Sequence, residues 1–157
     1  MKRAVLLLVV AVGIMMAFTH DVQATQKSPE WLSAPIECGA SPKEFIDNLS
    51  TAIGQAPISY YNDVTLVLFL IYYADERSRG IEEPIGSSFN EGNAISHSLN
   101  SVFKMCSENK PFSLATFENI EAGIQKKQKT FYEDFTTKHK ESLREHLETY
   151  HNAPPKK

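Results

Sequence analysis

Apolar residues recur along this chain with the 3.6-residue period of α-helices, in segments separated by short polar breaks. The first segment opens with Ser41-Pro42-Lys43-Glu44, where serine is a predicted N-cap, proline fits the first turn and glutamate completes a capping box. Its apolar stripe ends at a predicted stop, Gly54, and consists of Phe45, Ile46, Leu49 and Ile53.

The second segment is predicted to start at Asn62 or Asp63 and is apolar on nearly every side from Val64 to Tyr73. A helix of this kind has to be covered by neighbours on most of its surface. We therefore place it at the centre of the fold, with Gly80 as its left-handed stop.

Ser88-x-x-Glu91 predicts a second capping box, which opens a third helix that ends near Cys106. Ser113 is the predicted cap of a fourth helix, whose apolar face continues to Tyr150 and which Gly123 bends or divides. Alternating strand patterns are absent. The chain is thus predicted to be all-α, a small disulfide-linked bundle of four to five helices with a long C-terminal helix.

The first 24 residues have the form of a cleaved secretory signal peptide. Met1-Lys2-Arg3 is cationic, residues 4–18 are almost wholly apolar, and Val22-Gln23-Ala24 places small residues at the cleavage site. We expect a periplasmic protein cleaved near Ala24, with an arm at 25–40 anchored by Trp31. A helical domain at 41–120 and a helical extension at 121–157 are expected to follow.

The two cysteines, Cys38 and Cys106, are predicted to form a disulfide, because an exported protein meets an oxidising environment. A free or catalytic thiol is the alternative. Neither cysteine has the spacing of a redox pair or of a zinc site.

Charge and motifs narrow the possible functions. The whole chain has 16 basic and 19 acidic residues, and loss of Lys2, Arg3 and Asp21 with the leader changes its net charge from −3 to −4. This balance argues against a nucleic-acid partner, and no later apolar run reaches membrane-spanning length. Phosphate loops, zinc-protease motifs and nucleophile elbows are absent from the sequence, so we expect no enzyme, cofactor or metal.

Three histidines lie on the predicted helices, and two of them have two possible interpretations. His97 is expected to be solvated on the polar side of the third helix. His139 and His146 lie near the apolar stripe of the last helix, either as a pH switch or as half-exposed groups at its edge.

The arrangement resembles the HdeA/HdeB family of periplasmic acid-stress chaperones. The resemblance is carried by a cysteine before a helix with Glu44-Phe45-Ile46, by Tyr72-Tyr73 and Gly80 on the central helix, and by Val102-Phe103-Lys104-Met105-Cys106 followed by Asn109-Lys110-Pro111-Phe112. It covers about residues 36–117 and implies a Cys38–Cys106 bridge. It also implies a small helical protein, dimeric and inactive at neutral pH, which exposes apolar surface in acid.

Two non-enzymatic functions follow. An acid-stress chaperone would shield unfolded periplasmic proteins with surface that acid uncovers, for which we select Phe69, Tyr72, Tyr73, Val102 and Phe103. A secreted immunity or partner-binding protein would bind one dedicated protein through the last helix, with Phe131 and Phe135 as contacts. A homodimer is compatible with either, and a hydrolase with an unrecognised site is the third hypothesis.

Overall fold

The computed structural model describes residues 28–108 and 111–153, and every regular element in these ranges is helical. The predicted signal peptide and its cleavage site lie outside the described residues. None of the described helices has the length and apolarity needed to span a membrane. The prediction of an all-α fold is confirmed by α2 (Glu30–Ser33), α3 (Pro42–Ile53), α4 (Ile58–Ser78), α5 (Glu91–Glu108), α6 (Ala115–Lys127), α7 (Lys129–Phe135), the π-helix η1 (Thr136–Lys140) and α8 (Glu141–Asn152).

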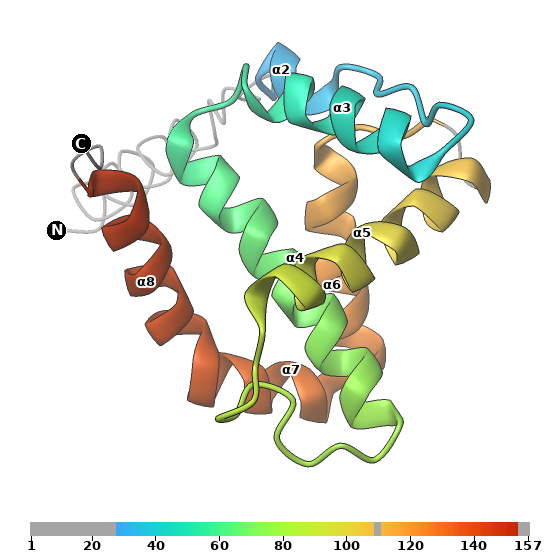
Figure 1. Cartoon of the computed structure of the whole chain (residues 1–157). Helices are drawn as coiled ribbons and strands as arrows, with labels where there is room; N and C mark the ends of the chain where they lie inside the picture. The colour runs from blue at the N-terminus through green and yellow to red at the C-terminus, as the bar shows by residue number, and fades with distance from the viewer. Residues whose placement is uncertain (1–27, 109–110, 154–157) are drawn as a thin grey trace, which may run out of the picture.

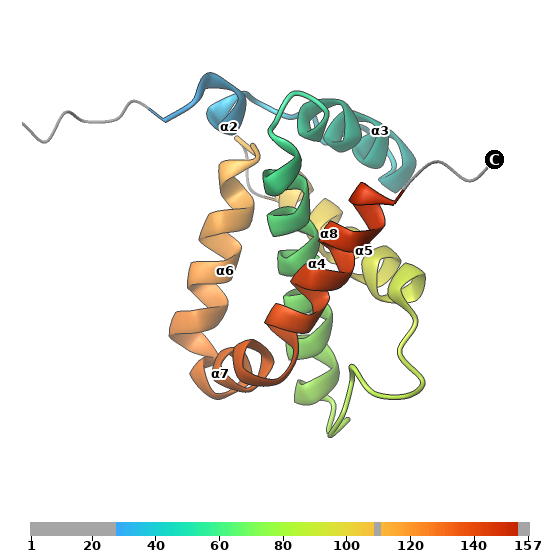
Figure 2. The same cartoon turned by 90° about the vertical axis from the view of Figure 1, so that its left-hand side faces the viewer.

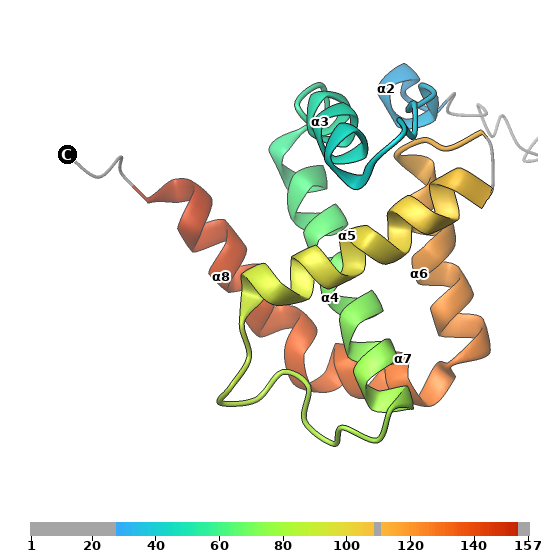
Figure 3. The ribbon, with the colours of Figure 1, turned by 45° about the vertical axis from the view of Figure 1, so that its right-hand side comes forward.

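Helix α4 runs through the middle of the molecule, and α5, α6, α7 and α8 all contact it (Figure 1). Figure 3 shows α5 crossing α4, with α3 above the crossing and α6 on the far side. The predicted central position is confirmed, since α4 is buried on nearly all sides. Its apolar character follows directly from a run of leucine, valine, isoleucine and aromatic residues.

The ends of α4 differ in how well the sequence predicted them. The helix starts at Ile58, after Pro57, and the predicted cap Asn62 lies inside it with only 6% of its surface exposed. Proline fixes the backbone ahead of the first turn, so the helix needs no polar side chain to start. Gly80 adopts φ +89°, the predicted left-handed stop.

The N-terminal part is more structured than the extended arm that was predicted. It contains the one-turn helix α2, and Trp31 packs its ring edge-on against Tyr60 at a centroid distance of 4.8 Å. Ser41 caps α3 as predicted by accepting a hydrogen bond from the Glu44 backbone N–H. The Glu44 carboxylate accepts from the Ala40 N–H at 2.6 Å, one residue before the expected donor.

Two further predicted caps were wrong. The side chain of Asn90, at Oδ1, accepts from the Asn93 N–H at 2.9 Å and starts α5, so the cap lies two residues after Ser88. At α6 the hydrogen bond runs the other way from the prediction, because the Ser113 N–H donates to Thr116 Oγ1 at 3.1 Å. The capping motifs were therefore placed near the right breaks, but at the wrong residue.

The last helix divides at Gln128 rather than at Gly123. Gln128 has φ −126° and ψ 50°, which ends α6 and turns the chain into α7. From Lys129 to Asn152 the chain is then helical without a break, and we call this stretch the C-terminal segment. Figure 2 shows α6 and α8 flanking α4, joined below by α7. The turn is required because an undivided helix would carry Phe135, Leu143 and Leu147 away from α4.

The buried side chains form two hydrophobic clusters, one on each side of α4. The first core joins α3, the far half of α5 and the start of α6 to α4: Ile36, Cys38, Phe45, Leu49, Val64, Val67, Leu68, Ile71, Val102, Cys106, Phe112, Leu114 and Phe117. The second core joins the C-terminal segment and the start of α5 to α4: Leu66, Phe69, Leu70, Tyr73, Ala94, Phe135, Leu143 and Leu147.

The predicted disulfide between Cys38 and Cys106 is present, and it lies entirely within the first core. It joins the chain just before α3 to the end of α5, with a Cα–Cα distance of 5.7 Å. Both cysteines are buried, and the described residues contain no free cysteine.

Replacing Cys38 and Cys106 together by alanine is expected to lower the free energy of unfolding by about 4 kcal/mol. The physical reason is that the bridge closes a loop of 68 residues and so restricts the unfolded chain. Urea denaturation followed by circular dichroism measures the loss, and reduction of the unmodified protein is the matched control. A loss below about 1 kcal/mol in both experiments would contradict this account.

Candidate functional site

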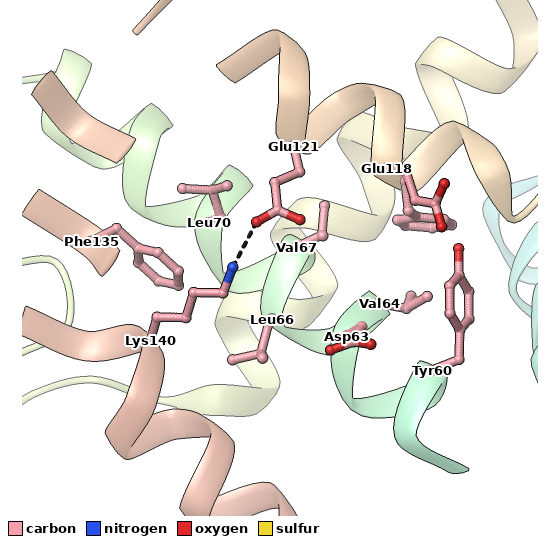
Figure 4. A pocket seen from close by; sticks show the side chains of 11 residues that line it. Tyr60, Asp63, Val64, Leu66, Val67, Leu70, Glu118, Glu121, Phe135 and Lys140 are labelled. Atoms are coloured by element: carbon pink, nitrogen blue, oxygen red, sulfur yellow. Dashed lines mark hydrogen bonds and ion pairs between the residues drawn. The ribbon is translucent and has the colours of Figure 1, made fainter. Parts of the chain in front are cut away.

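A cleft of about 270 Å³ lies between α4, α6 and the C-terminal segment (Figure 4). Its floor is apolar and comes mainly from one side of α4, with an aromatic ring from α6 and another from α7. These floor residues are Val64, Leu66, Val67, Leu70, Phe117 and Phe135.

Polar groups line the rim of this cleft. Lys140 Nζ donates to Glu121 Oε1 at 2.7 Å and lies 5.9 Å from the centre of the Tyr132 ring. This ion pair ties η1 to α6. At the opposite end are Tyr60, Asp63 and Glu118, of which Asp63 is 3.5 Å from the Arg144 guanidinium.

The hydroxyl of Tyr60 is already used as a donor. It hydrogen-bonds the backbone carbonyl of Leu114 at 3.0 Å, across 54 residues of sequence. Burial raises the pKa of this hydroxyl well above its usual value, and the nearby Glu118 and Asp63 carboxylates raise it further. Tyr60 therefore stays protonated, and its oxygen offers only acceptor capacity to the cleft.

A second polar site holds the C-terminal segment against the other end of α4. Asp134 accepts a hydrogen bond from the Tyr73 hydroxyl and another from Lys138 Nζ at 2.7 Å, and Arg77 lies 4.0 Å away. The hydrogen bond from Lys138, followed by that from Tyr73, lowers the pKa of Asp134 below its ordinary 3.8. Burial, with the bond to Asp134, raises the pKa of Tyr73 to about 12.

The histidines sit at contacts between helices. His139 packs against the rings of Tyr73 and Phe135, with centroid distances of 5.4 Å and 6.4 Å, and these two rings also contact each other. Burial lowers the pKa of His139 below its ordinary 6.5. His146 Nε2 is 3.0 Å from Glu91 Oε1 and so links α8 to the start of α5.

His97 is not the solvated residue that was predicted. Its Nε2 lies 2.9 Å from Asp75 Oδ2, and its ring meets Tyr72 edge-on. The amphipathic pattern of α5 placed His97 on the polar face, but α4 approaches that face closely enough to bury most of the imidazole. The residue therefore contributes to the α4–α5 contact.

One potential metal-ligand group occurs within the part of the chain that the structure describes. Asp75, Glu76 and His97 bring their ligand atoms within 4.8 Å of one another. However, the guanidinium of Arg79 lies 2.8 Å from Asp75 and 3.4 Å from Glu76. A cation already neutralises these carboxylates, so the group is best explained as an ion-pair network.

The seven residues predicted to bind a client or partner are covered to different degrees. Phe69, Tyr73 and Phe135 are buried together in the second core, whereas Val102 is buried in the first. The others are half-buried: Tyr72 packs against the second core, Phe103 packs against the first, and Phe131 belongs to neither. A surface built from the buried members would require part of the fold to open.

Sequence reasoning missed the cleft itself. Its rim residues Asp63, Glu118, Glu121 and Lys140 stand on three separate elements and belong to no motif. The only available signal was the polar interruption of otherwise apolar helix faces, which is common on solvated helices.

Tyr73→Phe is expected to lower the free energy of unfolding by about 1–3 kcal/mol, because it removes a hydrogen bond to a charged, largely covered carboxylate. The matched control is Tyr150→Phe, whose side chain is 73% exposed. Thermal denaturation followed by circular dichroism compares the two variants. Equal stability of both would show that the Tyr73–Asp134 contact does not anchor the C-terminal segment.

Comparison of the chain with protein-family models, with curated proteins and with solved structures finds no match. The resemblance to the acid-stress chaperones therefore stays a prediction from the residues quoted above. A function has to be argued from the two cores, the cleft and the groups that hold the C-terminal segment in place.

Proposed function

We propose that this protein is a non-enzymatic periplasmic binding protein that covers apolar surface at neutral pH and uncovers it in acid to shield unfolded proteins. One observation supports the proposal above all others. The first core contains the disulfide, whereas the second core is closed by polar contacts that depend on ionised carboxylates.

Four carboxylates hold the C-terminal segment or its neighbours. Three of them form single pairs, which are Glu121–Lys140, Asp63–Arg144 and Glu91–His146. The fourth, Asp134, accepts hydrogen bonds from both Lys138 and Tyr73. The segment contributes three buried apolar side chains to the second core, and the half-buried Tyr132 packs against them. The more covered pairs, those of Glu121 and Asp134, therefore add to its docking, whereas the exposed pairs of Asp63 and Glu91 contribute less. Carboxylates with ordinary pKa values near 4 lose their charge in strong acid, and the pairs are lost with it.

The lowered pKa values of His139 and Asp134 both make the folded state less stable as the pH falls. His139 is kept neutral in the folded state, so its contribution is present above pH 6.5 and falls as the pH drops through its lowered pKa. The charged groups near His139 are Asp134 and Lys138 on the C-terminal segment and Glu83 in the loop between α4 and α5. The contribution of Asp134 is present above pH 3.8 and is lost as the pH falls through its lowered pKa.

Net charge adds to the effect. With all carboxylates protonated, the chain after the predicted cleavage keeps 14 lysine and arginine residues and gains four charged histidines. Repulsion among about 18 positive charges loosens compact states. The disulfide keeps α3 and α5 together, so the opened form stays collapsed around its first core.

Opening of this kind would expose a defined surface. Phe69 and Tyr73 on α4 and Phe135 on the C-terminal segment would become available to clients, and Tyr72 beside them would lose its cover. Val102 and Phe103 would remain within or against the disulfide-linked core. The acid-uncovered surface is therefore centred on the second core.

A dedicated partner at neutral pH is the second candidate function. It is favoured by large apolar side chains that are exposed near the start of α4 and the end of α8: Ile58 (64%), Tyr61 (40%) and Tyr150 (73%). His151 connects them, since its ring contacts both tyrosines and lines a hollow shared with Ile58. An immunity-type partner would use this end without any change of pH.

Acidification from pH 7 to about pH 2 is expected to expose apolar surface, detected as dye binding, while helical circular dichroism is largely retained. In the same range the protein is expected to suppress aggregation of an acid-denatured client, measured by light scattering. Tight capture of one partner at neutral pH without client protection would favour the alternative function.

Asp134→Asn is expected to move the onset of dye binding to higher pH, because it removes a carboxylate that holds the C-terminal segment. Asp47→Asn is the matched control, since the Asp47 carboxylate is exposed and pairs with the exposed Lys43 on α3. Coincident transitions of the two variants would contradict local opening at the second core.

A further inference from the structure

The rim of the cleft carries more negative than positive charge. Its lining includes the carboxylates of Asp63, Glu118 and Glu121 but a single ammonium group, that of Lys140, which is paired with Glu121. Asp63 Oδ1 accepts a hydrogen bond from the Arg144 guanidinium at 3.5 Å, so this carboxylate offers its other oxygen to the cleft. Glu118 is exposed and forms no hydrogen bond or ion pair with the residues that the structure describes.

At the end of the cleft formed by Tyr60, Asp63 and Glu118, the side chains can only accept further hydrogen bonds. The proton of the Tyr60 hydroxyl is donated to the Leu114 carbonyl, so its oxygen accepts. The carboxylates of Asp63 and Glu118 also accept. Figure 4 shows the Tyr60 hydroxyl directed towards Glu118, with Asp63 beside them. A ligand that fits here has to donate hydrogen bonds and benefits from a positive charge.

The rest of the cleft is suited to hydrocarbon. Val64 and Val67 lie next to the acidic end, and Leu66, Leu70 and Phe135 continue the apolar floor towards the Lys140–Glu121 pair. At about 270 Å³ the cleft is slightly smaller than most small-molecule sites, which begin at about 300 Å³. The ligand body is therefore short and carries no second charge.

We propose that the cleft binds a small apolar amine, with its ammonium group between Asp63 and Glu118 and its hydrocarbon body on the floor formed by α4. This site operates in the closed form at neutral pH and is independent of the proposed opening in acid.

Isothermal titration of the purified protein at pH 7 with n-hexylamine, 1-hexanol and hexanoate tests the ligand class. The three probes share a hydrocarbon body and differ in charge. We expect n-hexylamine to bind at least about tenfold more tightly than 1-hexanol, the ratio that one charge-assisted hydrogen bond supplies, and hexanoate to bind most weakly. Equal binding of amine and alcohol, or no saturable binding of the amine, would overturn the proposal.

Glu118→Gln is expected to remove most of the preference for the amine, and Glu118→Lys is expected to reverse it in favour of hexanoate. Both changes are on an exposed side chain, so the fold should be retained. The matched control is Glu108→Gln, an exposed carboxylate at the end of α5, which should leave all three affinities within about twofold. An unchanged preference in Glu118→Gln would assign the amine to another site.

Because these titrations use no client and no acid, their outcome is separate from that of the proposed chaperone function. Amine binding without client protection would leave the cleft as a ligand site of the closed protein. Client protection without amine binding would support acid opening and reject this ligand class.

Discussion

The burial of α4 is the constraint on which the rest of this structure depends. This helix is apolar almost all round, with buried residues from Asn62 to Ala74 on every face, and it can exist in water only beneath a cover of other helices. Helices α5, α6, α7 and α8 contact it directly, α3 joins it in the first core, and two distinct clusters of side chains result. One part of that cover is fixed by a covalent bond, and the other part is held by packing and ion pairs.

The two parts of the cover are held by different chemistry. On one side a disulfide links the start of α3 to the end of α5, and an almost wholly apolar core surrounds it. On the other side the C-terminal segment docks through three buried apolar side chains, the half-buried Tyr132 and a set of ion pairs. Covalent links do not respond to pH between 7 and 2, whereas carboxylates and imidazoles do. The fold therefore contains one side that withstands acid and one side that titrates.

The cleft arises from the same asymmetry. The C-terminal segment leaves α6 at Gln128 and returns along α4, and the cleft lies between this segment, α6 and α4. Lys140 and Arg144 reach back from η1 and α8 to two of the acidic groups on α6 and α4, and Glu118 is left with no cation among the described residues. An acceptor-rich rim above a hydrocarbon floor is thus a consequence of how the chain turns, and it gives the closed form a ligand preference of its own.

The sequence by itself determined the helical class, the central place of α4, the stop at Gly80 and the pairing of Cys38 with Cys106. The signals for these features are helical periodicity, a helix that is apolar on all sides, the conformational freedom of glycine and a count of two cysteines. All four are local or compositional properties of the chain. Local signals failed where two nearby residues could each mark the end of a helix. Asn90 rather than Ser88 caps α5, and the chain turns at Gln128 rather than at Gly123. Only the tertiary structure decided that His97 meets Asp75, that Tyr73 meets Asp134, and that Glu118 and Lys140 share a cleft. Such contacts join positions that are up to 61 residues apart in the chain, and their partners are chosen by how the helices pack around α4.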